Sequence, residues 1–242
     1  IPFYHGLTFH TLQLSEISAL ISRQWLTNSH ACQQTLLVRN YMFQTGSKPH
    51  FLLSHCTGWS QSTLCCQSRG HSDVVDILLE AGADVHQATT KSGDVPLGVA
   101  AHNGHTETVQ RLLEAGANVN QQNKNGQTPV YFASWKGHTA VVKLLIENGA
   151  DISICDEDGF SPLYVASHEG HSDVVDILLE AGADVHQATT KNGDVPLGIA
   201  AQNGHTETVQ RLLEAGANVN HQNKDGASPL YVASQEGHTE VV

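Results

Sequence analysis

The chain has 242 residues, 40% of them apolar and 15% charged, which suits one or two ordinary domains or one continuous array. No stretch approaches 18 consecutive apolar residues, so we expect no membrane span. Residues 70–242 carry 23 acidic against 8 basic side chains, a net charge of −15 that argues against nucleic acid as a direct partner and favours basic or mixed-charge protein surfaces.

Residues 1–56 show no repeat and few turn signals, and they stay unassigned, as either disordered or mis-framed sequence. A helix over residues 11–26 is the one element we expect there. Residues 57–71, TGWSQSTLCCQSRGH, stand where DGFSPLYVASHEGH stands one hundred residues later. Codons for Ser-Gln-Glu, shifted by one base, can encode the Gln-Ser-Arg of residues 67–69. We therefore hypothesise a frame-disturbed repeat, and the alternative is a diverged capping repeat.

From residue 70 onward a Gly-His pair returns every 33 or 34 residues, beginning at Gly70, Gly104, Gly137, Gly170, Gly204 and Gly237. Each pair opens an amphipathic run such as residues 105–120, in which apolar residues recur at helical spacing. A glycine such as Gly116 then predicts the helix end. Ahead of each pair a shorter helix is expected, opening for example with Thr128-Pro129. Two short helices per period bury their apolar stripes only by stacking on neighbouring units.

These units resemble the ankyrin repeat family. Residues 128–152, TPVYFASWKGHTAVVKLLIENGADI, are similar to the family pattern of Thr-Pro-Leu-His-x-Ala, Gly-His and Leu-Leu-x-x-Gly-Ala. The resemblance implies an all-α solenoid of helix-turn-helix units with projecting hairpin loops, and a concave face formed by the loop tips and the first helices. It divides residues 57–242 into a degraded first repeat at 57–90, repeats at 91–123, 124–156, 157–190 and 191–223, and a truncated last repeat at 224–242, and we expect the natural protein to continue.

The chain departs from the family pattern at two kinds of position. The histidine that normally links neighbouring loops is replaced by tyrosine or glycine, which puts that link in doubt; the positions are Tyr131, Tyr164, Tyr231, Gly98 and Gly198. Val95 and Val195 stand where a hydroxyl usually caps the first helix. Because such a cap contributes roughly 0.5–2 kcal/mol, those two units are expected to be locally weaker.

Residues 70–142 and 170–242 are near-copies that differ at 12 positions. Six differences fall at positions where the family usually contacts partners: Ser92/Asn192, His102/Gln202, Asn125/Asp225, Gln127/Ala227, Trp135/Gln235 and Lys136/Glu236. Free drift of exposed positions is one interpretation. The other, which we favour, is a surface tuned for binding, because only Ala140/Glu240 clearly changes the outer helix face.

The resemblance predicts a partner-binding site at these loop tips and helix ends. Its centre is expected at Trp135, Lys136, Phe160, His168 and Glu169, where two aromatics would stand partly exposed, although they could instead pack on neighbouring loops. The full predicted set is Ser92, Asp94, His102, Asn103, Asn125, Gln127, Trp135, Lys136, Phe160, His168, Glu169, Asn192, Gln202, Asp225, Gln235 and Glu236.

No pattern in the chain predicts catalysis, a metal site, a cofactor or a small-molecule substrate. Histidines at the Gly-His positions are expected to serve the turn between helices, and the Cys and His residues near the N-terminus match no regular zinc spacing. The five cysteines are an odd number, which favours an intracellular, cytoplasmic location. We therefore predict a non-catalytic scaffold or adaptor. The alternatives are a recruiting module of a larger enzyme, such as a kinase or ubiquitin ligase, and a spacer in a membrane-linked protein.

Overall fold

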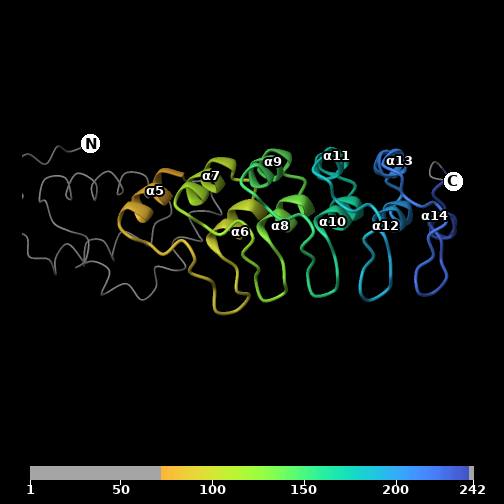
Figure 1. Ribbon diagram of the computed structural model, residues 1–242, viewed down its shortest axis with the longest axis horizontal. Helices are drawn as coiled ribbons and strands as arrows, with labels where there is room; N and C mark the ends of the chain where they lie inside the picture. The colour runs from red at the N-terminus through yellow and green to blue at the C-terminus, as the bar shows by residue number, and fades with distance from the viewer. Residues whose placement is uncertain (1–71, 240–242) are drawn as a thin grey trace, which may run out of the picture. The chain divides into compact units, whose positions relative to one another are not determined.

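A computed structural model describes residues 72–239 of the chain (Figure 1). These residues form ten α-helices and no β-strand, as the sequence predicted. The predicted helix at 11–26 and the degraded segment at 57–69 lie outside them. The helices are α5 (Ser72–Glu80), α6 (Pro96–His102), α7 (Thr106–Glu114), α8 (Pro129–Trp135), α9 (Thr139–Glu147), α10 (Pro162–Glu169), α11 (Ser172–Glu180), α12 (Pro196–Gln202), α13 (Thr206–Glu214) and α14 (Pro229–Glu236).

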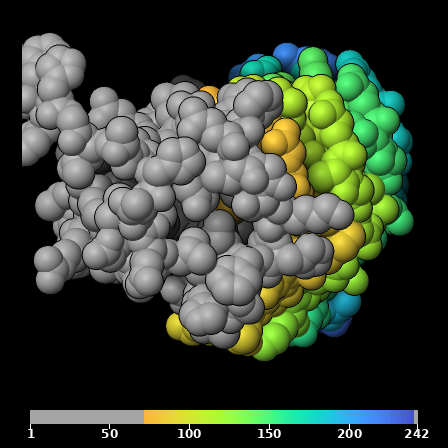
Figure 2. Space-filling model, turned by 90° about the vertical axis from the view of Figure 1, so that its left-hand side faces the viewer, coloured from red at the N-terminus to blue at the C-terminus, as the bar shows by residue number. Residues whose placement is uncertain are grey.

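The helices pack in two parallel rows (Figure 1). The even-numbered helices α6 to α14 form the row of first helices, each contacting the next, and the odd-numbered helices α5 to α13 form the row of second helices. The connecting loops project beyond the first helices, on the side away from the second row (Figure 1). Seen along the stack, successive units lie one behind another, from gold to blue (Figure 2). The described part of the chain is therefore a solenoid.

The first helices begin as the sequence predicts. Thr128, Ser161 and Ser228 each accept a hydrogen bond from the backbone N–H three residues later, at 3.1–3.3 Å, and proline occupies the first helical position. Val95 and Val195 provide no such bond, and both side chains are buried instead. The units that open with valine thus exchange a polar cap for apolar packing.

The core runs through the whole described stack because each repeat contributes the same residues to it. Second helices supply a buried leucine at equivalent positions, namely Leu112, Leu145, Leu178 and Leu212. First helices supply an alanine that lets adjacent helices approach closely, namely Ala100, Ala133, Ala166, Ala200 and Ala233. Burying one leucine stabilises the fold by roughly 1.5–3 kcal/mol, so every additional repeat extends a continuous apolar core.

The Gly-His pair joins neighbouring repeats as well as neighbouring helices. Nε2 of His138 donates to the carbonyl oxygen of His102, one repeat earlier, at 3.0 Å. The ring lies against Gly104, where an added Cβ would approach it to 2.6 Å, and Gly104 has a φ of +73°. Glycine is therefore required twice over, for its backbone conformation and for the missing side chain. The same bond recurs at His171, His205 and His238.

The loops are also connected from repeat to repeat. One backbone N–H per loop donates to the loop before it, as from Lys124 to Ser92 at 3.0 Å and from Glu157 to Asn125 at 3.0 Å. The link that the family's histidine would make is made at one position by tyrosine, since Tyr131 Oη donates to Asp156 Oδ2 at 3.1 Å. The replacement therefore keeps a connection between repeats there and changes its chemistry.

Candidate protein-binding face

The predicted contact residues come from two structural elements that each repeat places in the same way. One element is the loop tip immediately before the first helix, and the other is the last turn of that helix. Because the first helices stack side by side, the two sets form two rows along one face of the stack, the face that the family resemblance predicts to be concave. Most of the predicted residues are exposed, and six are half-buried: Ser92, Asp94, His102, Gln127, Trp135 and Phe160.

An aromatic cluster occupies the first half of this face. His102 makes edge-to-face contacts with Phe132 and Trp135, with ring centroids 5.8 Å apart in each case. Burial lowers the pKa of His102, and the nearby positive charge of Lys136 acts in the same direction. The neutral form of the imidazole is therefore favoured, and it lies against two aromatic rings. These contacts do not test the partner-binding role predicted for Trp135, which stays a prediction.

Trp135 is held in place by polar neighbours. Its indole Nε1 donates to Glu169 Oε1 on the next repeat at 3.2 Å, and His168 Nδ1 lies 2.9 Å from the same oxygen. Lys136 Nζ stands 4.1 Å from the centroid of the indole ring, a cation–π contact. Partial burial acts to raise the pKa of Glu169, but the hydrogen bonds from His168 and Trp135 outweigh it and lower that pKa. An aromatic side chain held in this way binds with little loss of conformational entropy.

Phe160 is more packed than an isolated surface aromatic. Its ring stacks on Tyr164 with centroids 4.9 Å apart and planes within 5°. The ring remains half-buried, so part of it still faces solvent. Beside it the loop tip carries Asp158, whose carboxylate pairs with Lys191 of the next loop at 2.8 Å. The sequence allowed Phe160 to be either partly exposed or packed on a neighbour. The structure shows both, since the ring packs on Tyr164 and keeps a solvent-accessible part.

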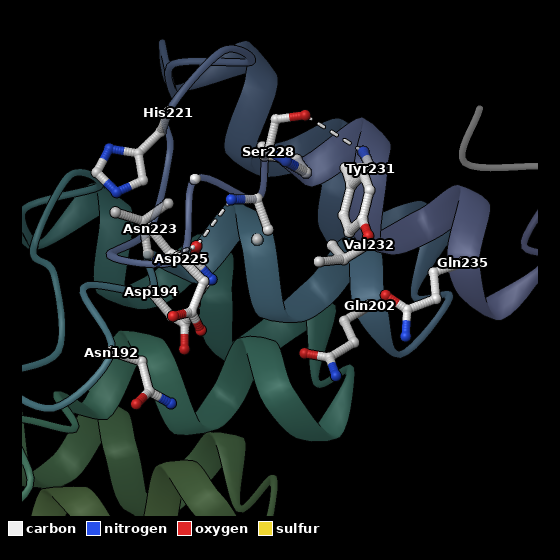
Figure 3. A pocket seen from close by; sticks show the side chains of 15 residues that line it. Asn192, Asp194, Gln202, His221, Asn223, Asp225, Ser228, Tyr231, Val232 and Gln235 are labelled. Carbon is white, nitrogen blue, oxygen red and sulfur yellow. Dashed lines mark hydrogen bonds between the residues drawn. The ribbon is translucent and has the colours of Figure 1, made fainter.

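A cavity of about 550 Å³ lies in the second half of the face, between α12, α14 and their loops (Figure 3). Four predicted contact residues line it, namely Asn192, Gln202, Asp225 and Gln235. Figure 3 shows Asp225 on the loop side, with Asp194, and the two glutamines on the side of the helix ends. The structure therefore brings these four into one site, whereas Trp135, Lys136, Glu169 and His168 form another.

Sequence reasoning missed several residues of this face. Phe132 and Tyr164 support the aromatic cluster, and Asp194, His221 and Val232 line the cavity. The change from Phe132 to Val232 was visible between the two copies, but it falls in the middle of a helix, outside the family's usual contact positions. A signal for it was Gly98 in the preceding repeat, whose missing side chain leaves room for the phenylalanine ring.

The described part of the chain contains His, Asp and Glu side chains and one cysteine, Cys155. Within residues 72–239 no group of three or more His, Cys, Asp or Glu side chains is placed to hold a metal ion. Burial raises the pKa of the Cys155 thiol, and the charge of Asp156 adds to this, so the thiolate is disfavoured. No helix in this part of the chain is long and apolar enough to cross a membrane.

Stacked helix pairs with projecting loops and a continuous contact surface define the class of α-helical repeat proteins. Comparison with family models identifies the member of that class. The model for ankyrin repeats in three copies matches residues 62–156, 97–189 and 186–242, and the chain belongs to the ankyrin repeat family. A comparison with curated proteins found no match. Ankyrin repeats are in general protein–protein interaction modules.

Proposed function

We propose that this chain is a non-catalytic scaffold or adaptor that binds a protein partner through its concave face. The observation that carries this proposal is the aromatic cluster around Trp135, which is half-buried, fixed by Glu169 and bordered by the exposed Lys136. Rigid, partly exposed tryptophan surrounded by polar groups is the composition typical of interface hot spots. The odd number of cysteines supports an intracellular, cytoplasmic location.

Comparison of the two copies suggests a variant that tests binding at Trp135. At the positions of Trp135 and Lys136 the second copy has Gln235 and Glu236, at the end of a helix of the same kind. The double substitution Trp135→Gln with Lys136→Glu therefore uses side chains that the array already accepts. Lys143→Glu is the control, because Lys143 is exposed on a second helix and undergoes the same change of charge.

The measurement is affinity capture from native lysate with the full chain and both variants, after circular dichroism has shown equal helix content. We expect a partner held by the parent and by Lys143→Glu to be lost from the double variant. Truncation of one hot spot costs 2 kcal/mol or more, a loss of roughly 30-fold in affinity. A protein captured equally by all three forms would place binding elsewhere. Capture of nothing by any form would favour the spacer alternative.

A further inference from the structure

We propose that the cavity between α12 and α14 binds an arginine side chain presented by the protein partner. This inference rests on the proposed function, since it names the chemistry that the second half of the concave face recognises. The cavity measures about 550 Å³, which exceeds one side chain and leaves room for the adjoining peptide backbone.

The lining has two polar ends and an apolar wall. Asp194 and Asp225 lie at the loop end, and Gln202 and Gln235 at the helix end, while Val232 belongs to the wall between them (Figure 3). The other apolar and aromatic lining residues are Val195, Ala227, Pro229 and Tyr231, and the other polar ones are Asn192, His221, Asn223 and Ser228. A ligand that fits has a flat or aliphatic body and a cationic group with several donors.

The matching place in the first copy is filled. There Phe132 stands in place of Val232, and its ring lies 3.6 Å from the Cβ position of Gly98. At Gly198 nothing lies within 4 Å of that position. The larger side chains of Gln127 and Trp135 narrow the first copy further, where the second has Ala227 and Gln235. The second copy thus has smaller side chains than the first at three positions of one repeat, Ala227, Val232 and Gln235, and all three line the cavity against α12.

Divergence between the copies is concentrated at this cavity. Eight of the twelve differing positions line it in the second copy, although its lining comprises fifteen of the 73 compared positions. The eight are Asn192, Gln202, His221, Asp225, Ala227, Ser228, Val232 and Gln235. The remaining four differences include two aliphatic exchanges, Val99/Ile199 and Val130/Leu230. The differences between the copies thus gather at one site, while the Gly-His pairs that join the repeats are the same.

The same differences make the site more acidic. Asn125 becomes Asp225, which adds a carboxylate. Ser92 donates to Oδ2 of Asp94 in the first copy, whereas the second copy has Asn192 at that position, so Asp194 loses this hydroxyl and retains the Asn223 amide on Oδ1 at 2.9 Å. Two carboxylates with free acceptor capacity then face the cavity.

In another repeat of the chain, the carboxylate at the position equivalent to Asp225 forms an ion pair. Asp158 occupies the position of Asp225 in the middle repeat, and its Oδ1 lies 2.8 Å from Lys191 Nζ. Arginine fits the larger cavity better than lysine, because its planar fork offers five donors to carboxylate and amide oxygens and stacks on an aromatic face such as Tyr231. An acidic or phosphorylated ligand would be repelled by the two carboxylates.

The probe is N-acetyl-arginine amide, titrated into the full, isotope-labelled chain and followed by the backbone amide signals of the cavity. Gly198, Gly226 and Val232 report on the cavity, and Gly98 and Gly126 report on the first copy. We expect saturable shifts in the second copy only, with a dissociation constant on the order of 1 mM. N-acetyl-glutamine amide, which has the same kind of stem without the charge, is the matched ligand control.

Two variants and a converse variant make the test specific. Ala227→Gln with Val232→Phe and Gln235→Trp installs the first copy's side chains and should abolish the saturable shifts. Asp225→Asn keeps the cavity and should weaken binding roughly tenfold, the effect of one charged hydrogen bond. Asn125→Asp adds the carboxylate to the first copy without a cavity, and we expect no binding there.

Three results would overturn the inference: absence of saturation up to about 50 mM, which is far above a millimolar constant, equal shifts with the glutamine probe, or unchanged binding after the cavity is filled. None of them affects the capture experiment at Trp135 and Lys136, because those residues lie on another part of the face. Loss of capture there without arginine binding would leave the proposed function standing, and arginine binding without capture would place recognition at the cavity alone.

Discussion

The two copied segments, residues 91–139 and 191–239, have the same scaffold and present different surfaces. The loop-to-loop bond from Lys124 to Ser92 measures 3.0 Å, and its counterpart from Lys224 to Asn192 measures 2.8 Å. The imidazole bonds of His138 and His238 to the repeat before them are both 3.0 Å. On the concave face, by contrast, an aromatic cluster in one copy corresponds to an acidic cavity in the other.

This comparison separates the residues that a repeat needs for folding from the surface residues that can vary between repeats. The bonds between repeats that both copies share involve backbone groups and the histidine of the Gly-His pair, so they tolerate exchange of the side chains that face outward. Free drift would alter exposed positions without regard to one another. The smaller side chains Ala227, Val232 and Gln235 all line one cavity, on α14 and the loop before it, which supports the interpretation of a tuned surface.

The largest expected effect comes from adding one methyl group where repeats meet. In Gly104→Ala and Gly204→Ala the new Cβ would lie 2.6 and 2.7 Å from the following histidine ring. Left-handed strain costs roughly 1–2 kcal/mol, and displacement of the ring loses a hydrogen bond worth about 1 kcal/mol. We expect the free energy of unfolding in urea to fall by about 3 kcal/mol in each variant. The two decreases should be equal if the copies share one scaffold.

Gly116→Ala is the control for this pair. Gly116 has a φ of +88°, but nothing lies within 4 Å of its Cβ position. The free energy of unfolding of Gly116→Ala should therefore fall only by the cost of backbone strain, roughly 1–2 kcal/mol. A loss at Gly104 no larger than at Gly116 would show that the histidine contact contributes nothing. A much smaller loss at Gly204 than at Gly104 would break the equivalence of the copies.

A smaller effect is expected at the tyrosines, because a described repeat follows Tyr131 and none follows Tyr231. Tyr131 is 6% exposed and donates to Asp156, whereas Tyr231 is 61% exposed. Tyr131→Phe should therefore lower the free energy of unfolding by about 1 kcal/mol, whereas Tyr231→Phe should leave it almost unchanged. Adding Asp156→Asn to each variant completes a double-mutant cycle. Coupling with Tyr131 but not with Tyr231 is the expected outcome, and additive effects at Tyr131 would remove the proposed link between repeats.

The sequence allowed the fold to be predicted because the information for it is local and repeated. The Gly-His period, the capping hydroxyls and the apolar spacing each specify a helix end or a buried stripe, and the structure confirms the all-α solenoid. The cavity could not be predicted in this way. It depends on the combined volume of side chains such as Val232 on α14 and the absent one at Gly198 on α12, positions that lie in different repeats and meet only after stacking. Tyr131 was noticed as a departure, but its partner Asp156 belongs to the next repeat.

The smallest expected effect is a pH dependence carried by one copy alone. The pKa of His102 is lowered from 6.5, first by burial and then by Lys136, so the folded chain binds this proton less readily than the unfolded chain. The stability that neutral His102 allows is therefore fully present above pH 6.5 and is lost as the pH falls through the lowered pKa. Because the ring is half-exposed, we expect a loss of only a few tenths of a kcal/mol, measured as the urea midpoint at pH 7.5 and at pH 5.5.

His102→Gln, which installs the side chain of the second copy, should reduce the fall in midpoint between those two pH values. Gln202→His provides the reverse exchange, since a histidine there would face Gln235 and Glu236 in place of Trp135 and Lys136. It would lack both the aromatic cover and the neighbouring positive charge, so we expect no lowering of its pKa and no added loss of stability in acid. If His102→Gln left the pH dependence unchanged, or Gln202→His increased it, the aromatic cluster would not be what distinguishes the titration of the two copies.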